Sequence, residues 1–425
     1  MNGKTELLSP AGNLEKLKIA FAYGADAVYG GVSHFSLRIR SGKEFTDETF
    51  QEGIDYAHKL GKKVYVTING FPFNSQINLL KKHIAKMRDM KPDALIVATP
   101  GVVKLCSEIA PDIPIHLSTQ ANVLNYLDAQ VYYDMGVRRI IAAREVSLKD
   151  VAEIKKHIPE LEIEIFVHGS MCFAYSGRCL VSAVQMGRVP NRGSCANDCR
   201  FEYTLYAENK EHNTLFRLEE QPEIGTYIFN AKDMNLASHV DEILKSGVVD
   251  SLKIEGRTKS PYYCAVTANA YRMAIDDYYA NNFEAQKYQD ELNTTKNRGF
   301  TDAYLIHKPF EKERDDTQNH DYAISTGSYE VCGLVIEDEE HFMCKYKIYP
   351  DDEIDLLVPH DKKIFEVDNE IGSVYKVDDV YKIKFKKIIT QDDRELDSVH
   401  SGNVNPIRLP IKLPYMTMLR VKNNE

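Results

Sequence analysis

Short apolar runs alternate with longer amphipathic segments from the N-terminus to about residue 255. The runs have the length and composition of buried strands. They lie at Leu7–Ser9, Ala27–Tyr29, Lys63–Ile68, Ala94–Ala98, Ile113–Leu117, Arg139–Ala142, Ile163–Val167 and Ser251–Ile254. Segments between them, such as Asn13–Tyr23, Asp47–Leu60 and Leu79–Met90, carry apolar residues three and four positions apart, which predicts helices.

This alternation predicts an α/β fold, a (β/α)8 barrel of the TIM type, over residues 1–310. An open, doubly wound sheet is the alternative. The number of strand–helix units favours the barrel, and so does the lack of a GxGxxG motif after the first strand.

One connection is far longer than the others. Residues 168–250 separate the seventh predicted strand from the eighth, and loops of this length are usually functional. A hairpin of Phe201–Tyr206 with Tyr227–Phe229, around the acidic loop Glu208–Glu223, is expected inside this insertion. The insertion follows the C-terminal end of a strand, where barrel enzymes keep their active sites.

The pattern changes after the last predicted barrel strand. Tyr262–Tyr279 and Phe283–Asn297 are compatible with helices, and the polar stretch Glu311–Asn319 is expected to be a linker. Alternation with a period of two then predicts a small all-β domain over residues 322–425. Its expected strands are Tyr329–Glu337, Phe342–Ile348, Glu353–Leu357, Ser373–Val377 and Tyr381–Ile388.

Composition indicates a globular protein with reduced thiols. The chain has 425 residues, 43% hydrophobic residues and a formal net charge of −10. It contains no apolar run of about 18 residues and no signal-like N-terminus, so we expect a cytoplasmic protein without a membrane span. In that compartment, clustered cysteines indicate metal binding or catalysis rather than disulfides.

Four cysteines occur within the long insertion in the pattern C-x6-C-x15-C-x3-C: Cys172, Cys179, Cys195 and Cys199. Such a set suits a zinc ion or an iron–sulfur cluster, and buried unliganded thiols are the alternative. A radical-SAM motif is excluded, because position 202 is Glu202. A nucleophilic Cys172 or Cys179 with His168 would compete with the ligand role.

Arginines accompany these cysteines in an otherwise acidic chain. Arg178, Arg188, Arg192 and Arg200 make the segment locally basic, and Tyr175 lies among them. Such a surface could contact RNA phosphates and stack an unpaired base. The alternative is that the arginines only pair with Asp198 and the acidic loop.

Polar residues also follow the predicted strands, where a barrel would direct them into its mouth. The set comprises Asn69, Thr99, Gln120, Arg144, Glu145, His168, Lys253, Glu255 and Arg257. Arg144, Lys253 and Arg257 are candidates for binding a carboxylate or phosphate, and His168 and Glu255 for proton transfer. Ordinary strand-end solvation is the alternative for any one of them. The GxSxG and HExxH hydrolase motifs are missing.

Several long motifs resemble peptidase family U32, the collagenase-like family, and within it the tRNA hydroxylation protein P group. They are HGSMCFAYSGRCLVS (168–182), GRVPNRGSCANDCR (187–200), TYIFNAKDM (226–234), SLKIEGRTKSPYY (251–263), ELLSPAGNLEKLKIAFAYGADAVYGG (6–31) and NRGFTDAY (297–304). The resemblance covers essentially the whole chain, including the C-terminal β-domain.

The resemblance implies a prephenate-dependent hydroxylase that forms 5-hydroxyuridine at the tRNA wobble position. It also implies a [4Fe–4S] cluster on Cys172, Cys179, Cys195 and Cys199. Many relatives carry a further cysteine where this chain has Asn235, so the ligand set is open there. A dicarboxylate such as prephenate suits Arg144, Lys253 and Arg257, with Asn69 and Gln120 as further contacts. The alternatives are a collagenase-like peptidase, or a tRNA-binding accessory protein with a structural four-cysteine metal site.

Overall fold

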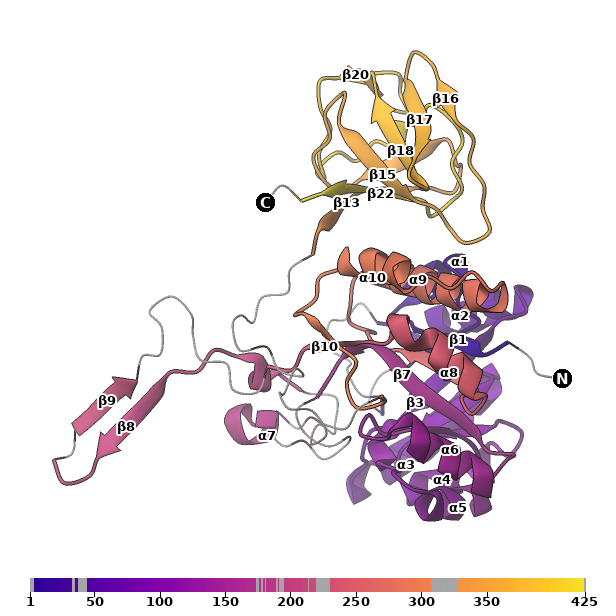
Figure 1. Ribbon diagram of the computed structural model, residues 1–425. Helices are drawn as coiled ribbons and strands as arrows, with labels where there is room; N and C mark the ends of the chain where they lie inside the picture. Colours follow the sequence, from indigo (N-terminus) through magenta and orange to yellow (C-terminus); the bar gives the residue numbers. More distant parts are fainter. Residues whose placement is uncertain are drawn as a thin grey trace.

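A computed structural model describes residues 4–423 except 33–34, 37–43, 173–175, 177–178, 180, 189, 191–194, 213, 219–229, 307–318 and 320–326. It has a barrel, a long excursion from the end of one barrel strand, and a β-domain beside the barrel (Figure 1). The predicted linker lies almost wholly outside the described residues.

The barrel is a closed ring of eight parallel strands, as the alternation of runs predicts. Each strand pairs with the next, and the last pairs with both the seventh and the first. The strands are β1 (Glu6–Pro10), β2 (Ala27–Gly30), β3 (Lys63–Ile68), β4 (Ala94–Val97), β5 (Ile115–Leu117), β6 (Val137–Ile141), β7 (Glu162–Ser170) and β11 (Ser251–Ile254). They are almost entirely buried, because helices cover the outer face.

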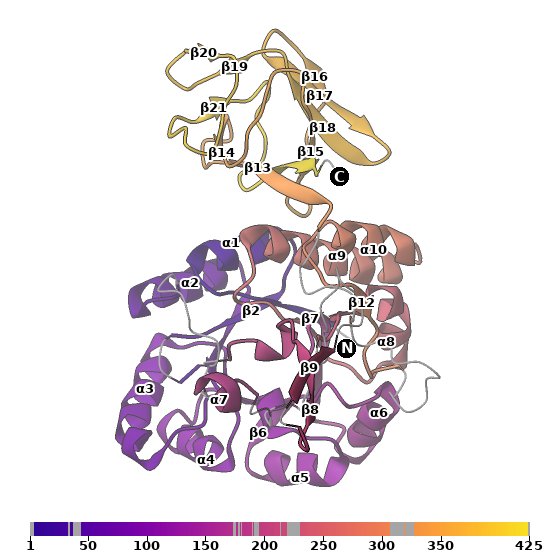
Figure 2. The ribbon, with the colours of Figure 1, turned by 90° about the vertical axis from the view of Figure 1, so that its left-hand side faces the viewer.

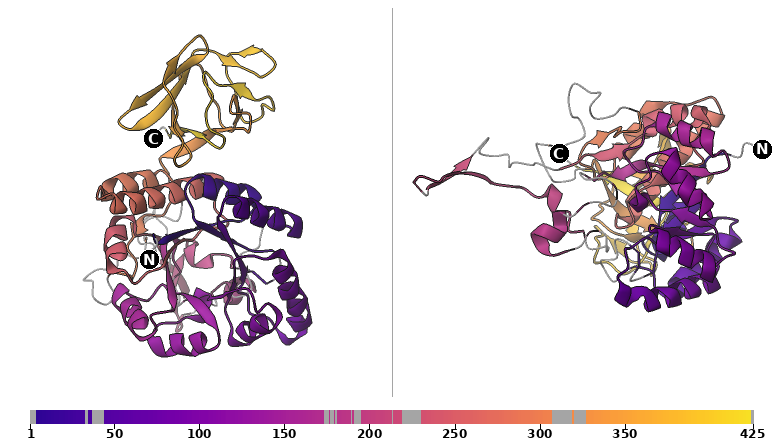
Figure 3. Two further views of the ribbon diagram at one scale, coloured as in Figure 1. Left: turned by 90° about the vertical axis from the view of Figure 1, so that its right-hand side faces the viewer. Right: turned by 90° about the horizontal axis from the view of Figure 1, so that it is seen from below.

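The surrounding helices form a ring that is visible from both ends of the barrel (Figures 2 and 3). They are α1 (Leu14–Ala22), α2 (Asp47–Lys59), α3 (Ile77–Met90), α4 (Pro100–Ile109), α5 (Tyr126–Asp134), α6 (Leu148–His157), α8 (Val240–Ser246), α9 (Pro261–Tyr279) and α10 (Ala285–Asn293). Asn13, Thr46, Asn125, Ser147 and Ser260 begin five of these helices by accepting a hydrogen bond from a backbone N–H of the first turn.

The end of β7 departs from the regular barrel. Its register against β11 shifts between Lys253 and Ile254, so that Phe166 pairs with Lys253 but His168 pairs with Ile254. This bulge reverses the inward and outward alternation. Beyond it, β10 (Asp233–Asn235) pairs with β7 in antiparallel fashion, and β12 (Phe300–Thr301) pairs with β10.

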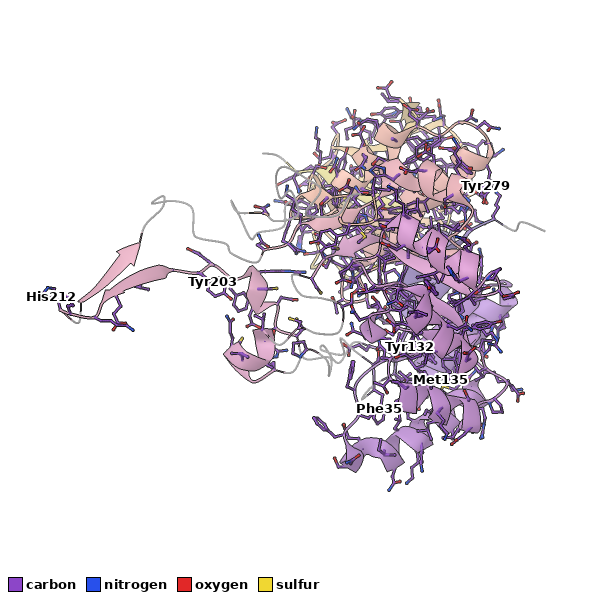
Figure 4. The ribbon with its side chains drawn as sticks, turned by 60° about the horizontal axis from the view of Figure 1, so that its bottom comes forward. Phe35, Tyr132, Met135, Tyr203, His212 and Tyr279 are labelled. Carbon is purple, nitrogen blue, oxygen red and sulfur yellow. The ribbon has the colours of Figure 1, made fainter. Side chains whose placement is uncertain are left out.

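The long insertion leaves the barrel from the end of β7. It contains the short helix α7 (Val181–Met186), the turn η4 (Asp198–Arg200) and a hairpin of β8 (Leu205–Asn209) with β9 (Thr214–Leu218). The hairpin projects far from the barrel, with Tyr203 near its base and His212 at its tip (Figure 4). The predicted partner of the first hairpin strand was wrong, because β8 pairs with β9. β9 lies within the stretch that was expected to be an acidic loop, and residues 227–229, the predicted partner, fall outside the described residues.

The C-terminal part forms an antiparallel sheet in the order β16-β17-β18-β15-β22-β13-β14-β21. Its strands are β13 (Tyr329–Val335), β14 (His341–Cys344), β15 (Glu353–Leu357), β16 (Val367–Asp368), β17 (Gly372–Val377), β18 (Val380–Phe385), β21 (Ile407–Arg408) and β22 (Met418–Lys422), with a small ribbon of β19 (Ile388–Ile389) and β20 (Glu395–Leu396). The central strand β22 was not predicted, although it pairs with both β13 and β15.

The β-domain is attached to the barrel through buried contacts. The Tyr23 hydroxyl lies 2.8 Å from the carbonyl oxygen of Leu357 and 2.9 Å from that of Met416. Arg420 forms a bidentate pair with Glu291 of α10, at 2.7 and 3.0 Å. Of the helices described, none combines the length and the hydropathy that a membrane crossing would need.

Candidate functional site

Three charged residues at the end of β11 share one neighbour, Tyr29 of β2. The Tyr29 hydroxyl lies 3.1 Å from Glu255 Oε2 and 3.0 Å from the carbonyl oxygen of Ile254. Lys253 Nζ and the guanidinium of Arg257 lie 4.2 and 5.8 Å from the centre of the Tyr29 ring. The structure therefore brings three predicted site residues together at the barrel mouth, by which we mean the C-terminal ends of the barrel strands.

Arg257 is 9% exposed and is held by two hydroxyl groups. Its Nη1 donates to Ser36 Oγ at 2.6 Å and to Thr67 Oγ1 at 3.0 Å. Gly31 makes this arrangement possible, because a Cβ there would come within 2.5 Å of both hydroxyl oxygens. These two hydroxyl groups thus hold the guanidinium in a fixed orientation.

Lys253 has a different environment. Its Nζ forms a 2.6 Å ion pair with Glu164, which is fully buried in β7. Glu164 also lies 3.2 Å from Arg139, so the three residues form a charged network inside the barrel. Burial lowers the pKa of Lys253, while Glu164 and Glu255 oppose that shift. Much of the Lys253 charge is therefore already balanced within the protein.

Two further predicted contacts lie on neighbouring strands. Asn69, after β3, donates through Nδ2 to Ser118 Oγ at 3.3 Å. Gln120 lies in the turn η2 (Thr119–Ala121) after β5 and is half-buried. The third predicted residue on this side, Thr99, is the N-cap position of α4.

The loop after β6 joins the mouth to the insertion. The Arg144 guanidinium lies 4.0 Å from the centre of the Phe166 ring, close enough for a cation–π contact. Its neighbour Glu145 accepts hydrogen bonds from the backbone N–H of Ser176 at 3.0 Å and from the Ser176 hydroxyl at 3.3 Å. Ser176 lies between two of the cysteines, so Glu145 ties their segment to the barrel.

His168 does not lie in the mouth, and the expectation that its side chain points there was wrong. The bulge in β7 turns its ring outward, where it contacts Tyr263, Tyr271 and Phe300 with ring centres 5.5–5.7 Å apart. Burial lowers the pKa of His168 to about 3, an effect that Asp233 opposes. The imidazole is therefore neutral at physiological pH and enclosed by aromatic rings.

A glycine stabilises this outward turn. Gly169 has φ +112°, a conformation that residues with a Cβ rarely adopt. A Cβ at this position would lie 2.5 Å from the carbonyl oxygen of Glu255. The same carbonyl accepts a 2.7 Å hydrogen bond from Tyr263. The end of β11 is thereby packed directly against the end of β7.

The four clustered cysteines lie in residues 171–200, the cysteine segment. Cys172 is exposed, and Cys179, Cys195 and Cys199 are half-buried. Burial raises the pKa of Cys179 and of Cys199, and the charges of Cys172 and Cys195 add to both shifts. The four thiols therefore lie within electrostatic reach of one another.

Their geometry is not that of a formed metal centre. Within the described part of the chain, no three His, Cys, Asp or Glu side chains are arranged to hold a metal ion. The donor set itself, four thiols gathered in one segment beside a barrel mouth, has the chemistry of a four-thiolate site for zinc or for an iron–sulfur cluster.

The predicted RNA-contacting residues are only partly described. Arg188 is exposed just after α7. Arg200 is half-buried, and its Nη2 donates to the carbonyl oxygen of Met171 at 3.0 Å, so it also braces the cysteine segment. Tyr175, Arg178 and Arg192 lie outside the described residues.

The side chain of Asn235 forms three hydrogen bonds within the protein. Its Oδ1 accepts hydrogen bonds from the Tyr271 hydroxyl at 3.2 Å and from the Ala237 N–H at 3.0 Å, and its Nδ2 donates to Gln289 at 2.7 Å. It thus belongs to the same buried cluster as His168. The side chain is committed to holding β10 against α9 and α10.

Sequence reasoning missed three residues that shape this region: Tyr29, Ser36 and Ser176. Tyr29 occupies a predicted strand end, which was a usable signal. The other two are recognised only from contacts between segments far apart in sequence. Asp198 was interpreted as a possible partner for the arginines, whereas no ion pair to it occurs among the described residues.

Comparison with known proteins places these features in a family. The chain is 60% identical over 419 residues to the tRNA hydroxylation protein P of Helicobacter pylori, with 99% of each chain covered. It is 30% identical to a collagenase of Porphyromonas gingivalis, covering 71% of this chain and 73% of that one. It is 32% identical to the 23S rRNA 5-hydroxycytidine C2501 synthase of Escherichia coli, covering 64% and 39%. A sequence model of peptidase family U32 matches residues 12–315, and the chain belongs to that family.

Proposed function

We propose that this protein is a tRNA-modifying enzyme that hydroxylates the wobble uridine to 5-hydroxyuridine, with prephenate as co-substrate or activator and a [4Fe–4S] cluster. The observation that carries the RNA substrate is the full-length similarity to a tRNA hydroxylation protein. The relative named as a 5-hydroxycytidine synthase supports C5 of a pyrimidine as the reacting position.

The cluster would be held by Cys172, Cys179, Cys195 and Cys199. Their gathering in one segment supports this set, and the hydrogen bonds that Asn235 accepts from Tyr271 and Ala237 support leaving that residue out of it. Once bound, an iron–sulfur cluster supplies one-electron chemistry. Glu145 holds the segment at the mouth, so chemistry at the cluster and ligands in the mouth would be neighbours.

The mouth supports binding of a small dianion such as prephenate. Arg257 is oriented by two hydroxyl groups, and Arg144 lies against the Phe166 ring. A guanidinium in a fixed orientation binds a carboxylate through two parallel hydrogen bonds. Lys253 contributes less, because it is already paired with Glu164. Asn69 and Gln120, which follow β3 and β5, are further polar groups at the mouth.

The rim of the mouth supports contact with a single-stranded RNA loop. Phe73, in the loop after β3, is 59% exposed, and Phe201, just after η4, is 48% exposed. Exposed rings of this kind offer stacking surfaces for unpaired bases, and Arg188 offers a charge for phosphate. Arg178, Arg192 and Tyr175 stay predicted RNA contacts.

Nucleoside mass spectrometry of bulk tRNA tests this function. A strain lacking the gene should lose wobble 5-hydroxyuridine, and the wild-type gene should restore it while Cys172→Ala does not. Unchanged nucleosides in the deletion strain would reject the substrate. Purified wild-type protein should be brown under anaerobic conditions, and a colourless protein with stoichiometric zinc would reject the cluster.

A collagenase-like peptidase is the second candidate, because the Porphyromonas gingivalis relative carries that name. It would need a nucleophilic cysteine with a base. The exposed Cys172 could be reached by a substrate, but His168 is enclosed by three aromatic rings. Gelatin cleavage by the purified protein, abolished in Cys172→Ala, would favour it.

The third candidate is a tRNA-binding accessory protein whose four-cysteine metal site is structural. Under that role, Glu255→Gln and Arg257→Ala would leave wobble modification intact, while Arg192→Ala would weaken tRNA binding. Under the hydroxylase role, Arg257→Ala lowers modification in the same complementation assay.

A further inference from the structure

A short run of the β-domain, just after β14, presents aromatic and basic side chains in alternation. It reads Lys345-Tyr346-Lys347-Ile348-Tyr349, and we call residues 345–349 the tyrosine–lysine run. Every side chain in it except that of Ile348 is exposed, with Tyr346 at 53% and Tyr349 at 46%. The run contains no acid, although the chain as a whole has a formal net charge of −10. Two large rings are therefore open to solvent beside two positive charges.

The backbone of the tyrosine–lysine run is held in place by the rest of the domain. Ile348 is fully buried and exchanges two backbone hydrogen bonds with Val399, at 2.8 and 3.0 Å. The Lys345 N–H donates to the carbonyl oxygen of Cys332 at 2.7 Å. Because Ile348 is buried, its two exposed neighbours in the run face outward. The rings are thus presented on a fixed backbone, which lowers the entropy that ligand binding costs.

The two lysines of the run are not ion-paired. Among the described residues, no carboxylate pairs with Lys345 or Lys347. Lys347 Nζ instead lies 4.6 Å from the centre of the Tyr349 ring, a cation–π distance. Other lysines of the domain do have carboxylate partners: Lys376, Lys382, Lys384, Lys386 and Lys387. The charges of the run are therefore available to an anionic ligand.

The acids that follow the run have partners of their own. Asp351 forms an ion pair with Lys384 at 3.2 Å. Asp352 accepts a 2.7 Å hydrogen bond from the Tyr349 N–H, so its carboxylate helps to fix the end of the run. Neither carboxylate pairs with a lysine of the run.

This composition favours RNA over protein as the partner of the run. Lysine is depleted in protein–protein interfaces, where aromatic residues and arginine are enriched. Rings interleaved with positive charges are typical of surfaces that bind single-stranded nucleic acid, because the rings stack on bases and the charges contact phosphates. Each tyrosine of the run lies within two residues of a lysine, so both kinds of contact are presented together.

We propose that the tyrosine–lysine run is a second contact surface for the tRNA, in addition to the rim of the barrel mouth. The inference rests on the proposed tRNA substrate and adds a binding surface to it. Both tyrosines stack on unpaired bases, and both lysines contact phosphates. Tyr23 and Arg420 attach the β-domain beside the barrel (Figure 1), so the two surfaces belong to one body and add to each other in affinity.

The test measures the binding of bulk tRNA, isolated from a strain that lacks the gene, to the purified full-length protein. The double variant Tyr346→Ala/Tyr349→Ala removes both rings, and Tyr346→Phe/Tyr349→Phe keeps them. A third variant, Lys345→Ala/Lys347→Ala, removes the charges. All of these side chains are exposed, and thermal unfolding verifies that each variant folds.

Two single variants of the same domain are matched controls. Phe365→Ala removes a ring that is 74% exposed outside the run, and Lys376→Ala removes a lysine that is paired with Asp379. We expect binding at least about five-fold weaker without the two tyrosine rings, and close to wild type with phenylalanine in their place. Loss of the two lysines should reduce the slope of log K against log salt by about 1.5. Both controls should bind as the wild type does.

Wild-type affinity and salt slope in the folded alanine variants would overturn the proposal, including the case in which the run serves a protein partner. Losses of equal size in Phe365→Ala would also overturn it, because they would indicate a non-specific effect. Failure of the proposed function is distinguishable: unchanged nucleosides in the deletion strain reject the hydroxylation, and the binding assay still decides the role of the run. A wild-type protein that does not bind tRNA overturns both.

Discussion

The carboxylate of Glu145 accepts two hydrogen bonds from Ser176, one from its backbone N–H at 3.0 Å and one from its hydroxyl at 3.3 Å. This contact ties the middle of the cysteine segment to the loop after β6. It relates a residue next to Arg144 in the mouth to a residue between Cys172 and Cys179. The cysteine segment and the barrel mouth are therefore mechanically linked.

Replacing Glu145 should loosen the cysteine segment. Glu145→Ala leaves the Ser176 N–H without its charged acceptor, a loss of about 1.5–3 kcal/mol for hydrogen bonds of this type. We expect faster hydrogen exchange at the Ser176 amide and less iron per chain, with Glu145→Gln intermediate. Glu160→Gln is the control, because Glu160 is exposed and lies two residues before β7 begins. Unchanged exchange in Glu145→Ala would contradict the link.

Lys253 should behave as a structural residue before it behaves as a ligand. Lys253→Met leaves the buried Glu164 with only the longer Arg139 contact, and breaking such a pair costs about 3–5 kcal/mol. The free energy of unfolding in urea should fall accordingly. The double variant Lys253→Met/Glu164→Gln should recover part of the loss. A single variant of wild-type stability that fails to bind prephenate would instead identify Lys253 as a substrate contact.

His168 should make the protein sensitive to acid. Its pKa is lowered to about 3 in the folded state, whereas an unfolded histidine titrates near pH 6.5. The neutral ring therefore contributes stability above about pH 6.5, and this contribution is lost as the pH falls, by up to about 1.4 kcal/mol per unit. His168→Gln should show a weaker fall in unfolding free energy between about pH 7 and about pH 5.

His116 also contributes to the pH dependence of the unfolding free energy, because burial lowers its pKa as well. The comparison of wild type with His168→Gln removes this contribution, since both proteins retain His116. Parallel pH profiles for the two proteins would show that His168 is not buried neutral.

Arg188 should contribute to tRNA binding through charge alone. Arg188→Ala is expected to weaken tRNA binding about equally for different sequences and to reduce the slope of log K against log salt by about one. Arg138→Ala provides the control, since Arg138 is also exposed but lies at the start of β6, away from the mouth. Equal effects of the two variants would indicate a non-specific interaction.

The barrel was predictable because each of its strands is buried on both faces. Such strands appear as continuous apolar runs, and helix caps such as Asn13 and Ser147 mark where the helices begin. The prediction of the hairpin failed because β9 carries no strand pattern. Its residues Thr214–Leu218 do not alternate between polar and apolar, and among the described strands β9 pairs only with β8. Strand β22 was missed because the chain before it shows no regular strand pattern.

The residues of the candidate site were predictable where side chains of a barrel strand alternate regularly between inside and outside. They were not predictable where a bulge interrupts that alternation. Lys253, Glu255 and Arg257 meet at Tyr29, as expected for one strand end. His168 obeys the same strand-end rule in sequence, but a single-residue bulge turns it outward, and a bulge leaves no composition signal. Asp198 was visible as an acid among arginines, and only its burial shows that none of the described arginines pairs with it.

The Tyr23 hydroxyl joins the barrel to the β-domain through two hydrogen bonds. It is fully buried, and both of its acceptors, the carbonyl oxygens of Leu357 and Met416, belong to the β-domain. A chain ending before residue 327 would leave that hydroxyl unsatisfied and Glu291 without Arg420. The barrel and the β-domain therefore share a buried interface that each needs for its polar groups to be paired. The two parts are expected to unfold in one cooperative transition.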